Sequence, residues 1–74
     1  MRITVKLFAT FRNGRFDAEV REVPPGTTVS GIVEEMDLPG KEIGIVLVNS
    51  RHANLSRMLA DGDTLAIFPL VGGG

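Results

Sequence analysis

Hydrophobic and polar residues alternate strictly at the start of the chain. Within residues 2–12 the apolar positions share one face, namely Ile3, Val5, Leu7, Ala9 and Phe11. A period of two over this length predicts a half-buried β-strand. Polar residues occupy the opposite face, and the exception there is the aromatic Phe8.

A second strand is predicted to pair with the first as a hairpin. Asn13 and Gly14 both accept positive φ, which is typical of a tight turn between antiparallel strands. The partner strand spans about residues 16–23, with Phe16, Ala18 and Val20 on its inward face. Two prolines and a glycine at residues 24–26 end it, because proline has no N–H to donate to a sheet.

The spacing of apolar residues then changes to that of a helix. Val29, Ile32, Val33 and Met36 form one stripe, and Thr28 is the predicted N-cap. Gly31 inside this helix costs about 1 kcal/mol relative to alanine, so we expect it to mark a close approach to the sheet. The dipeptide at residues 39–40, Pro-Gly, is predicted to end the helix.

The second half of the chain reads as two further strands. Residues 43–48 are almost continuously apolar, which suits a central strand buried on both sides or nearly so. Residues 49–52 are predicted to form a turn, and residues 53–59 allow either one helical turn or a minor strand. After a tight turn at residues 61–63, residues 64–68 form the last strand, with Leu65 and Ile67 facing inward.

The order strand, strand, helix, strand, strand predicts an α+β fold. One helix lying across one face of a mixed sheet of four to five strands buries both the helical stripe and the inward strand faces. A β-grasp arrangement, with the first and last strands adjacent and parallel, satisfies this. We expect one domain over residues 1–71, followed by a flexible glycine tail at residues 72–74.

Two phenylalanines fall on the face that this helix would leave open. Phe8 and Phe68 lie on adjacent predicted strands, and exposed aromatic patches usually mark an interface. Leu70 shares their parity, and Arg12 lies at the end of the first strand, near Phe8. The alternative is that residues 53–59 fold over both rings. Phe11 and Phe16 have the inward parity, which indicates a role in the core.

Composition excludes several classes of function. The chain has 74 residues, of which 43% are hydrophobic and 23% charged, so disorder is not expected. It has no cysteine and one histidine, His52, which excludes disulfides, iron–sulfur clusters and a histidine-rich metal site. A net charge of −1 provides no basic field for nucleic acid. No stretch is apolar enough to span a membrane, and we expect a cytoplasmic protein.

The glycine tail suggests insertion into another protein. Gly72, Gly73 and Gly74 directly follow an apolar run, and a chain without side chains can pass through a narrow channel. Three extended residues reach on the order of 10 Å, and five residues reach roughly 17 Å. The alternative is a frayed end that happens to be glycine.

Four segments together resemble the MoaD/ThiS group of small sulfur carriers, which are ubiquitin-like β-grasp proteins. They are Leu7-Phe8-Ala9 with Arg12, Pro25-Gly26-Thr27-Thr28-Val29, Val48-Asn49, and Asp61-Gly62-Asp63 followed by Phe68-Pro69-Leu70-Val71-Gly72-Gly73-Gly74. The last segment is the most specific and is closest to the small subunit of molybdopterin synthase. The chain departs from the group at Leu70, where a second proline is common, at Gly72, and at Ser50, where glycine is common.

The resemblance implies a carrier that is itself not an enzyme. An E1-like adenylating enzyme would use MgATP to activate the Gly74 carboxylate, and a persulfide donor would convert it to a thiocarboxylate. A sulfur-accepting synthase subunit would then receive the sulfur. Gly73 would give clearance in the partner's channel. The residues expected to contact partners are Phe8, Arg12, Phe68, Pro69, Leu70, Val71 and Gly72. The domain itself would bind no cofactor, metal, nucleic acid or membrane.

Other functions remain open at this point. Sulfur carriage for thiamine, a tungsten cofactor, cysteine or tRNA thiolation would use the same chemistry and differ in the acceptor. A ubiquitin-like modifier would instead join Gly74 to a lysine through an isopeptide bond. A plain β-grasp adaptor would not use the tail at all.

Overall fold

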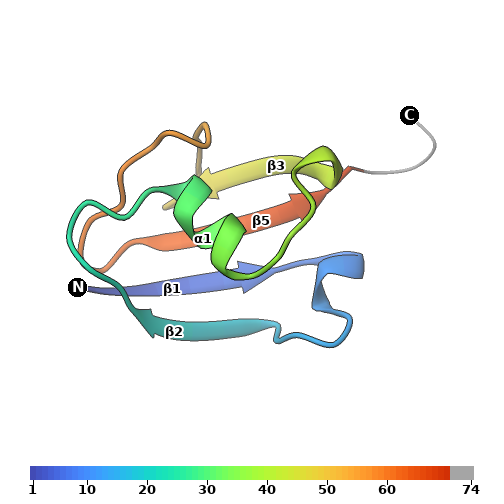
Figure 1. Ribbon diagram of the computed structural model, residues 1–74, viewed down its shortest axis with the longest axis horizontal. Coiled ribbons are helices and arrows are strands. Elements are labelled where there is room, and N and C mark those ends of the chain that lie inside the picture. The colour runs from blue at the N-terminus through green and yellow to red at the C-terminus, as the bar shows by residue number, and fades with distance from the viewer. Residues whose placement is uncertain (71–74) are drawn as a thin grey trace.

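The computed structural model describes residues 1–70, which form one mixed sheet with an α-helix lying across one face (Figure 1). Along the chain the elements are β1 (Arg2–Leu7), the 3-10 helix η1 (Ala9–Arg12), β2 (Ala18–Glu22), α1 (Val29–Glu35), the 3-10 helix η2 (Gly40–Glu42), β3 (Ile43–Val48), β4 (Arg51–His52) and β5 (Thr64–Pro69). Val71 and the predicted tail, Gly72, Gly73 and Gly74, lie outside the described residues.

The five strands have the order β2-β1-β5-β3-β4. The first and last long strands, β1 and β5, are adjacent and parallel, with Val5 opposite Leu65. The other pairs are antiparallel. The predicted α+β, β-grasp architecture with a mixed sheet is therefore confirmed, and its fifth strand is the two-residue β4.

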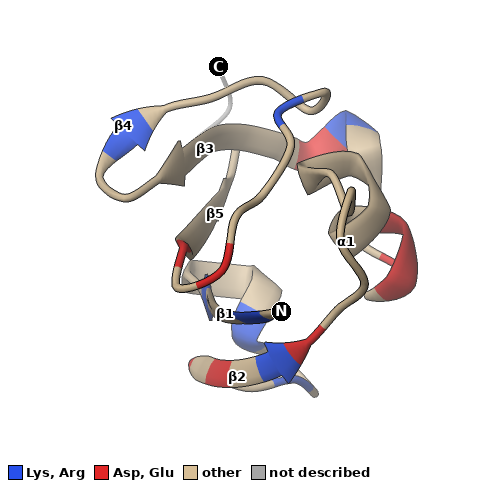
Figure 2. Ribbon diagram, turned by 90° about the vertical axis from the view of Figure 1, so that its left-hand side faces the viewer, with Lys and Arg blue, Asp and Glu red and all other residues tan. Residues whose placement is uncertain are grey.

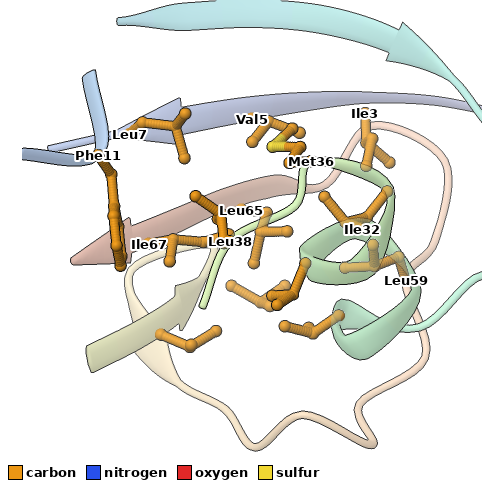
Figure 3. Packing of buried hydrophobic residues seen from close by; sticks show 14 of the residues in the cluster. Ile3, Val5, Leu7, Phe11, Ile32, Met36, Leu38, Leu59, Leu65 and Ile67 are labelled. Carbon is orange, nitrogen blue, oxygen red and sulfur yellow. The ribbon is translucent and has the colours of Figure 1, made fainter. Parts of the chain in front are cut away.

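The hydrophobic core lies between the sheet and α1 (Figure 3). Strand residues Val5, Leu7, Leu65 and Ile67 are fully buried, as the alternation predicts. The helical stripe is buried against them and consists of Val29, Ile32, Val33 and Met36. Each fully buried aliphatic side chain contributes about 1.5–3 kcal/mol, so these faces hold the helix on the sheet.

The first strand ends earlier than its alternation predicts. β1 stops at Leu7, and Ala9 turns the chain with a φ of 52° into η1. Phe11 still reaches the core, but from η1. Gly14 has the expected positive φ, whereas Asn13 has a φ of −62°, so the hairpin connection is longer than a two-residue turn.

The predicted faces of the second strand are reversed. Arg21 pairs with Ile3, which places Arg21 on the helix side, while Val20 is 57% exposed on the other side. The Arg21 guanidinium lies 5.7 Å from the Phe16 ring centroid and forms an ion pair with Glu35 of α1. At this sheet edge a long amphipathic side chain covers the core in place of an aliphatic one, and Phe16 packs partly buried against the core.

Helix α1 begins as predicted and ends differently. The Thr28 side chain accepts a hydrogen bond from the Gly31 N–H at 3.2 Å. At the C-terminus, Asp37 adopts a φ of 57°, and the Leu38 N–H donates to the Val33 carbonyl at 3.1 Å. These are features of a Schellman motif with aspartate in the position usually taken by glycine, so the predicted end at residues 39–40 is too late.

The expected reason for Gly31 is also wrong. A Cβ at this position would meet the Thr28 and Thr27 side chains at 3.7 and 3.8 Å, which are ordinary contacts. The helix therefore does not need glycine here to approach the sheet.

Strand β3 is buried on one face only. Val46 and Val48 face the core, whereas Ile45 is 43% exposed on the side without the helix. The prediction that both faces are buried is therefore wrong. The residues on the outer face of β3 are apolar, but no other element packs against them in the described part of the chain. The turn predicted at residues 49–52 is confirmed for Asn49 and Ser50, which both have positive φ, whereas Arg51 and His52 form β4 and pair with β3.

Candidate docking face and tail root

The face of the sheet opposite α1 presents two stacked aromatic rings. Phe8 and Phe68 have ring centroids 4.1 Å apart and planes inclined by 9°. The parallel register that pairs Leu7 with Ile67 brings the two rings together. Seen from the side, α1 lies on one side of the strands, and the described chain places no helix on the other (Figure 2). The structure thus brings together the two residues that sequence alternation singled out.

Further apolar residues extend this pair into a patch. Ile45 lies opposite Phe68 and Leu47 lies opposite Ala66 in the β3–β5 register. We call Phe8, Phe68, Ile45, Leu47 and Ala66 the sheet-face patch. Ile45 and Leu47 could not be assigned to this face from the sequence, because an unbroken apolar run does not reveal which of its residues lie outside the core.

The sheet-face patch is hollowed rather than flat. An open depression of about 530 Å³ is lined by Lys6, Phe8, Leu47, Asn49, Ser50, Thr64, Ala66 and Phe68. Ala66, one of the lining residues, has a small side chain and lies beside the larger Leu47 in the β3–β5 register. Such a surface can accept a protruding apolar side chain from a partner.

Residues 53–59 do not cover the two rings. The Ser30 N–H donates to the Leu55 carbonyl at 2.9 Å, and the Val29 N–H donates to the Arg57 carbonyl at 3.0 Å. Leu59 is buried in the core. This segment is therefore held on the helix side and contains neither a helical turn nor a strand, apart from one isolated bridge between Thr28 and Met58. The alternative role for residues 53–59 is wrong.

Arg12 lies at the border of the patch. Its guanidinium is 5.2 Å from the Phe8 ring centroid, and its Nε donates to the Leu7 carbonyl at 2.8 Å. The carboxylate of Asp17 lies 3.4 Å from the same Nε. These contacts orient the guanidinium over the ring, where cation–π attraction is favourable.

The last described residues form the root of the tail. Pro69 is buried at the end of β5, opposite Ile43, and Leu70 is exposed. The Leu70 N–H donates to the Glu42 carbonyl at 2.7 Å. We call Pro69 and Leu70 the tail root. Val71, Gly72, Gly73 and Gly74, the remaining predicted site residues, lie outside the described residues.

A buried carboxylate connects two turns at the start of β5, the end opposite the tail root. Asp63 accepts hydrogen bonds from the Ala60 N–H and the Asn49 side chain, each at 2.8 Å. These bonds, the Ala60 one first, lower the pKa of Asp63 from its ordinary value of 3.8. Asn49 in turn accepts from the Thr64 N–H at 2.9 Å. The pair fixes the β3–β4 turn against the start of β5.

Other binding chemistries find little support in residues 1–70. No cluster of three metal-ligating side chains occurs there, and His52 is exposed on β4. None of the helices within this range has the length and hydropathy needed to cross a bilayer. Within residues 1–70, the half-buried aromatic pair on the open face of the sheet is the feature best suited to contact another protein.

The fold and the open aromatic face define a ubiquitin-like β-grasp protein. Residues 5–74 match the model of the ThiS family, and the chain belongs to that family. The resemblance to MoaD/ThiS proteins is thereby confirmed. No curated protein sequence matches the chain.

Solved structures agree with this assignment. The chain is 31% identical to a protein assigned as molybdopterin converting factor, subunit 1, from Pyrococcus furiosus, with a TM-score of 0.76 over 96% of this chain and 99% of that one. It is 29% identical to SAMP1 from Haloferax volcanii, with a TM-score of 0.76 and complete coverage of both chains. Another structure names that protein small archaeal modifier protein 1.

A third structure shows the same fold within a complex. It contains subunits 1 and 2 of molybdopterin-converting factor from Helicobacter pylori, and its matching chain is 20% identical, with a TM-score of 0.67 and complete coverage of both chains. At this identity the likeness concerns the fold alone.

Proposed function

We propose that this protein is a sulfur carrier whose Gly74 carboxylate is activated by a partner enzyme and converted to a thiocarboxylate. The observation that supports this best is spatial. In the Phe8–Phe68 stack, Phe68 lies on β5, the strand that leads through Pro69, Leu70 and Val71 into the three glycines. A partner that binds the sheet-face patch therefore also receives the tail.

The activation step needs only the chain end from this protein. An oxygen of the Gly74 carboxylate attacks the α-phosphorus of MgATP in the adenylating enzyme, and the bond to the β-phosphate breaks, so pyrophosphate leaves. The product is an acyl-adenylate, in which AMP is a good leaving group. Glycine at residues 73 and 74 leaves the carbonyl uncrowded by side chains.

Sulfur then replaces the adenylate. The terminal sulfur of a donor persulfide attacks the acyl carbon and displaces AMP, and a second thiol cleaves the resulting S–S bond, forming a disulfide and releasing the thiocarboxylate. The chain has no cysteine, so the acyl carbon of Gly74 is where we place the carried sulfur. In a second enzyme the thiocarboxylate sulfur adds to an electrophilic carbon of the acceptor, and water then cleaves the bond between the sulfur and the Gly74 acyl carbon, which leaves the sulfur on the acceptor and regenerates the carboxylate.

Molybdopterin biosynthesis is the pathway that we propose first. The names of two structural neighbours refer to molybdopterin converting factor, and one of them is a complex of subunits 1 and 2. By analogy, the partners of this chain would be an E1-like adenylating enzyme and a synthase subunit. Thiamine, tungsten-cofactor, cysteine and tRNA-thiolation pathways would use the same carrier chemistry.

A protein modifier is the second candidate. The neighbour SAMP1 is named a modifier protein, and the same acyl-adenylate could react with a lysine amine instead of a persulfide. The two functions differ in the fate of the Gly74 carbonyl, which becomes a thiocarboxylate in one case and an isopeptide in the other.

Intact-mass measurement separates these functions. The protein is co-expressed with an E1-like adenylating enzyme and a persulfide source, and its intact mass is measured after purification. A mass gain equal to exchange of one oxygen for one sulfur, located at the C-terminus, supports the carrier. Lysine conjugates without any thiocarboxylate would favour the modifier and contradict the proposal.

A further inference from the structure

The start of β3 lies directly against the tail root. Ile43 pairs with Pro69 and Ile45 pairs with Phe68, so two steps along β3 correspond to one step along β5. Gly44 is the extra residue of this irregularity, which has the character of a β-bulge. Bulges redirect the strand that contains them and the backbone that faces them.

Gly44 leaves no room for a side chain. A Cβ built there would lie 2.7 Å from the Pro69 carbonyl oxygen and 3.0 Å from both the nitrogen and the Cα of Leu70. All three atoms are backbone, so a side chain could be accommodated only if the tail root and the start of β3 moved apart. Gly44 is not among the residues with positive φ. The requirement for glycine is therefore one of space and not of backbone conformation.

Backbone contacts, and not side-chain packing, hold Leu70 in place. Its side chain is 64% exposed, whereas its N–H donates to the Glu42 carbonyl at 2.7 Å. Residues 42–44 therefore contact the tail root in two ways. The Glu42 carbonyl accepts the hydrogen bond from Leu70, and Gly44, which has no side chain, lies directly against the backbone of the tail root.

We propose that Gly44 is a positioning residue that determines where the tail leaves the sheet. In its catalytic consequence this inference rests on the proposed activation of Gly74. The four residues from Val71 to Gly74 can span at most about 14 Å, so a displaced root changes the reach of the carboxylate. A misplacement of about 1 Å can cost up to 100-fold in rate, because reacting atoms must meet at a defined separation.

The first test compares Gly44→Ala with Gly40→Ala. Gly40 lies four positions earlier, and a Cβ there would meet no atom within 4 Å. Hydrogen exchange of the Leu70 amide should be slow in the wild type and in Gly40→Ala, and at least about tenfold faster in Gly44→Ala. The core amides of Val46 and Ile67 should stay protected in all three proteins.

The second readout is ATP–pyrophosphate exchange by the adenylating enzyme. Gly44→Ala should lower kcat by about tenfold or more, with KM for the carrier nearly unchanged, because the sheet-face patch that binds the enzyme is intact. Gly40→Ala should match the wild type in both parameters. Unaltered Leu70 exchange, or an unaltered kcat despite faster exchange, overturns the positioning role.

An insertion variant keeps the inference testable if Gly44→Ala does not fold. One additional glycine placed between Leu70 and Val71 leaves Gly44 untouched and shifts the register of the tail. We expect the same fall in kcat without a change in KM, and full activity of this variant would overturn the inference. If the wild type supports no pyrophosphate exchange, the proposed function fails, while Leu70 exchange still decides whether Gly44 holds the tail root.

Discussion

At the residue scale, the two aromatic rings interrupt an otherwise regular pattern. Phe68 occupies an outward position on β5 and Phe8 directly follows the neighbouring β1, and the parallel register of the two strands stacks the rings. Arg12 lies over Phe8 and is itself held by the Leu7 carbonyl. A half-buried stack with an oriented cation at its border has the composition of a binding hot spot, in which aromatic residues and arginine are enriched.

Replacing either ring by aspartate tests this role. Phe8→Asp or Phe68→Asp should weaken binding to the adenylating enzyme at least tenfold, because loss of an aromatic hot spot costs about 2 kcal/mol or more. Isothermal titration calorimetry measures the change. Met58→Asp is the matched control, since Met58 is also exposed but lies outside the sheet-face patch. Equal affinity of all variants would contradict the docking role.

Asp63 gives stability a pH dependence at the same scale. Its folded-state pKa is lowered by the hydrogen bonds from Ala60 and Asn49. Stability from the ionised carboxylate is therefore complete above the ordinary value of 3.8 and is lost as the pH falls below that value through the folded-state pKa. We expect the unfolding temperature of the wild type to decline in this acidic window.

The variant Asp63→Asn shows whether this carboxylate is responsible. The asparagine cannot ionise and would direct a donor at the Asn49 amide or the Ala60 N–H, so it should be less stable near neutral pH. The difference from the wild type should shrink as the pH falls, because the wild type loses its advantage. Thermal unfolding monitored by circular dichroism across the pH series measures it, and a constant difference at every pH would refute the assignment.

At the element scale, the ends of the elements depart from the sequence pattern more than their middles do. β1 gives way to η1 although the alternation continues to Phe11, and α1 ends in a left-handed Asp37 before the expected glycine. In both cases a non-glycine residue adopts positive φ because hydrogen bonds and burial nearby outweigh its intrinsic preference. Such local costs become visible only when the packing is known.

The two glycines beside α1 and β3 lead to opposite expectations. Gly31→Ala should raise the free energy of unfolding by about 0.5–1 kcal/mol, because alanine is the better helix former and its Cβ makes only ordinary contacts. Chemical denaturation measures this change, with Gly44→Ala, which forces a backbone clash, as the contrasting variant. If Gly31→Ala lowered the free energy of unfolding, this expectation would be wrong, and the added methyl group would have to clash with its neighbours.

At the scale of the whole molecule, one strand connects the sheet-face patch to the tail root. The sheet-face patch spans β1, β5 and β3, and β5 runs from the patch into the tail root. Because β5 lies in the middle of the sheet, both the patch and the tail root rest on the most securely paired strand. The helix side is left to the core and to residues 53–59.

Deleting Gly73 and Gly74 should separate binding of the adenylating enzyme from activation of the tail. The shortened protein should bind the adenylating enzyme within about threefold of the wild-type affinity, since hot-spot contacts on the patch dominate binding. It should support no pyrophosphate exchange, because the carboxylate would no longer reach the nucleotide. Loss of binding would show that the tail, and not the patch, provides the affinity, and retained function in cells would favour an adaptor.

The sequence by itself determined the class of fold and the two outward rings. Alternation in β1 and β5, the helical stripe and the turn residues are local signals, and Leu65 and Ile67 could be placed inward from spacing alone. Phe8 and Phe68 could be found for the same reason.

Only the tertiary structure decided the partners across strands. The inward and outward faces of β2 are the reverse of those predicted, and Arg21 on the helix side forms an ion pair with Glu35. Ile45 is exposed because α1 covers only one face of β3. The tertiary structure also decided that Gly44 has no space for a side chain, since the Pro69 carbonyl that excludes one belongs to a strand distant in sequence. The period of the sequence pattern indicates on which face of a strand a residue lies. The strand register and the elements that pack on the sheet determine which residues that face contacts.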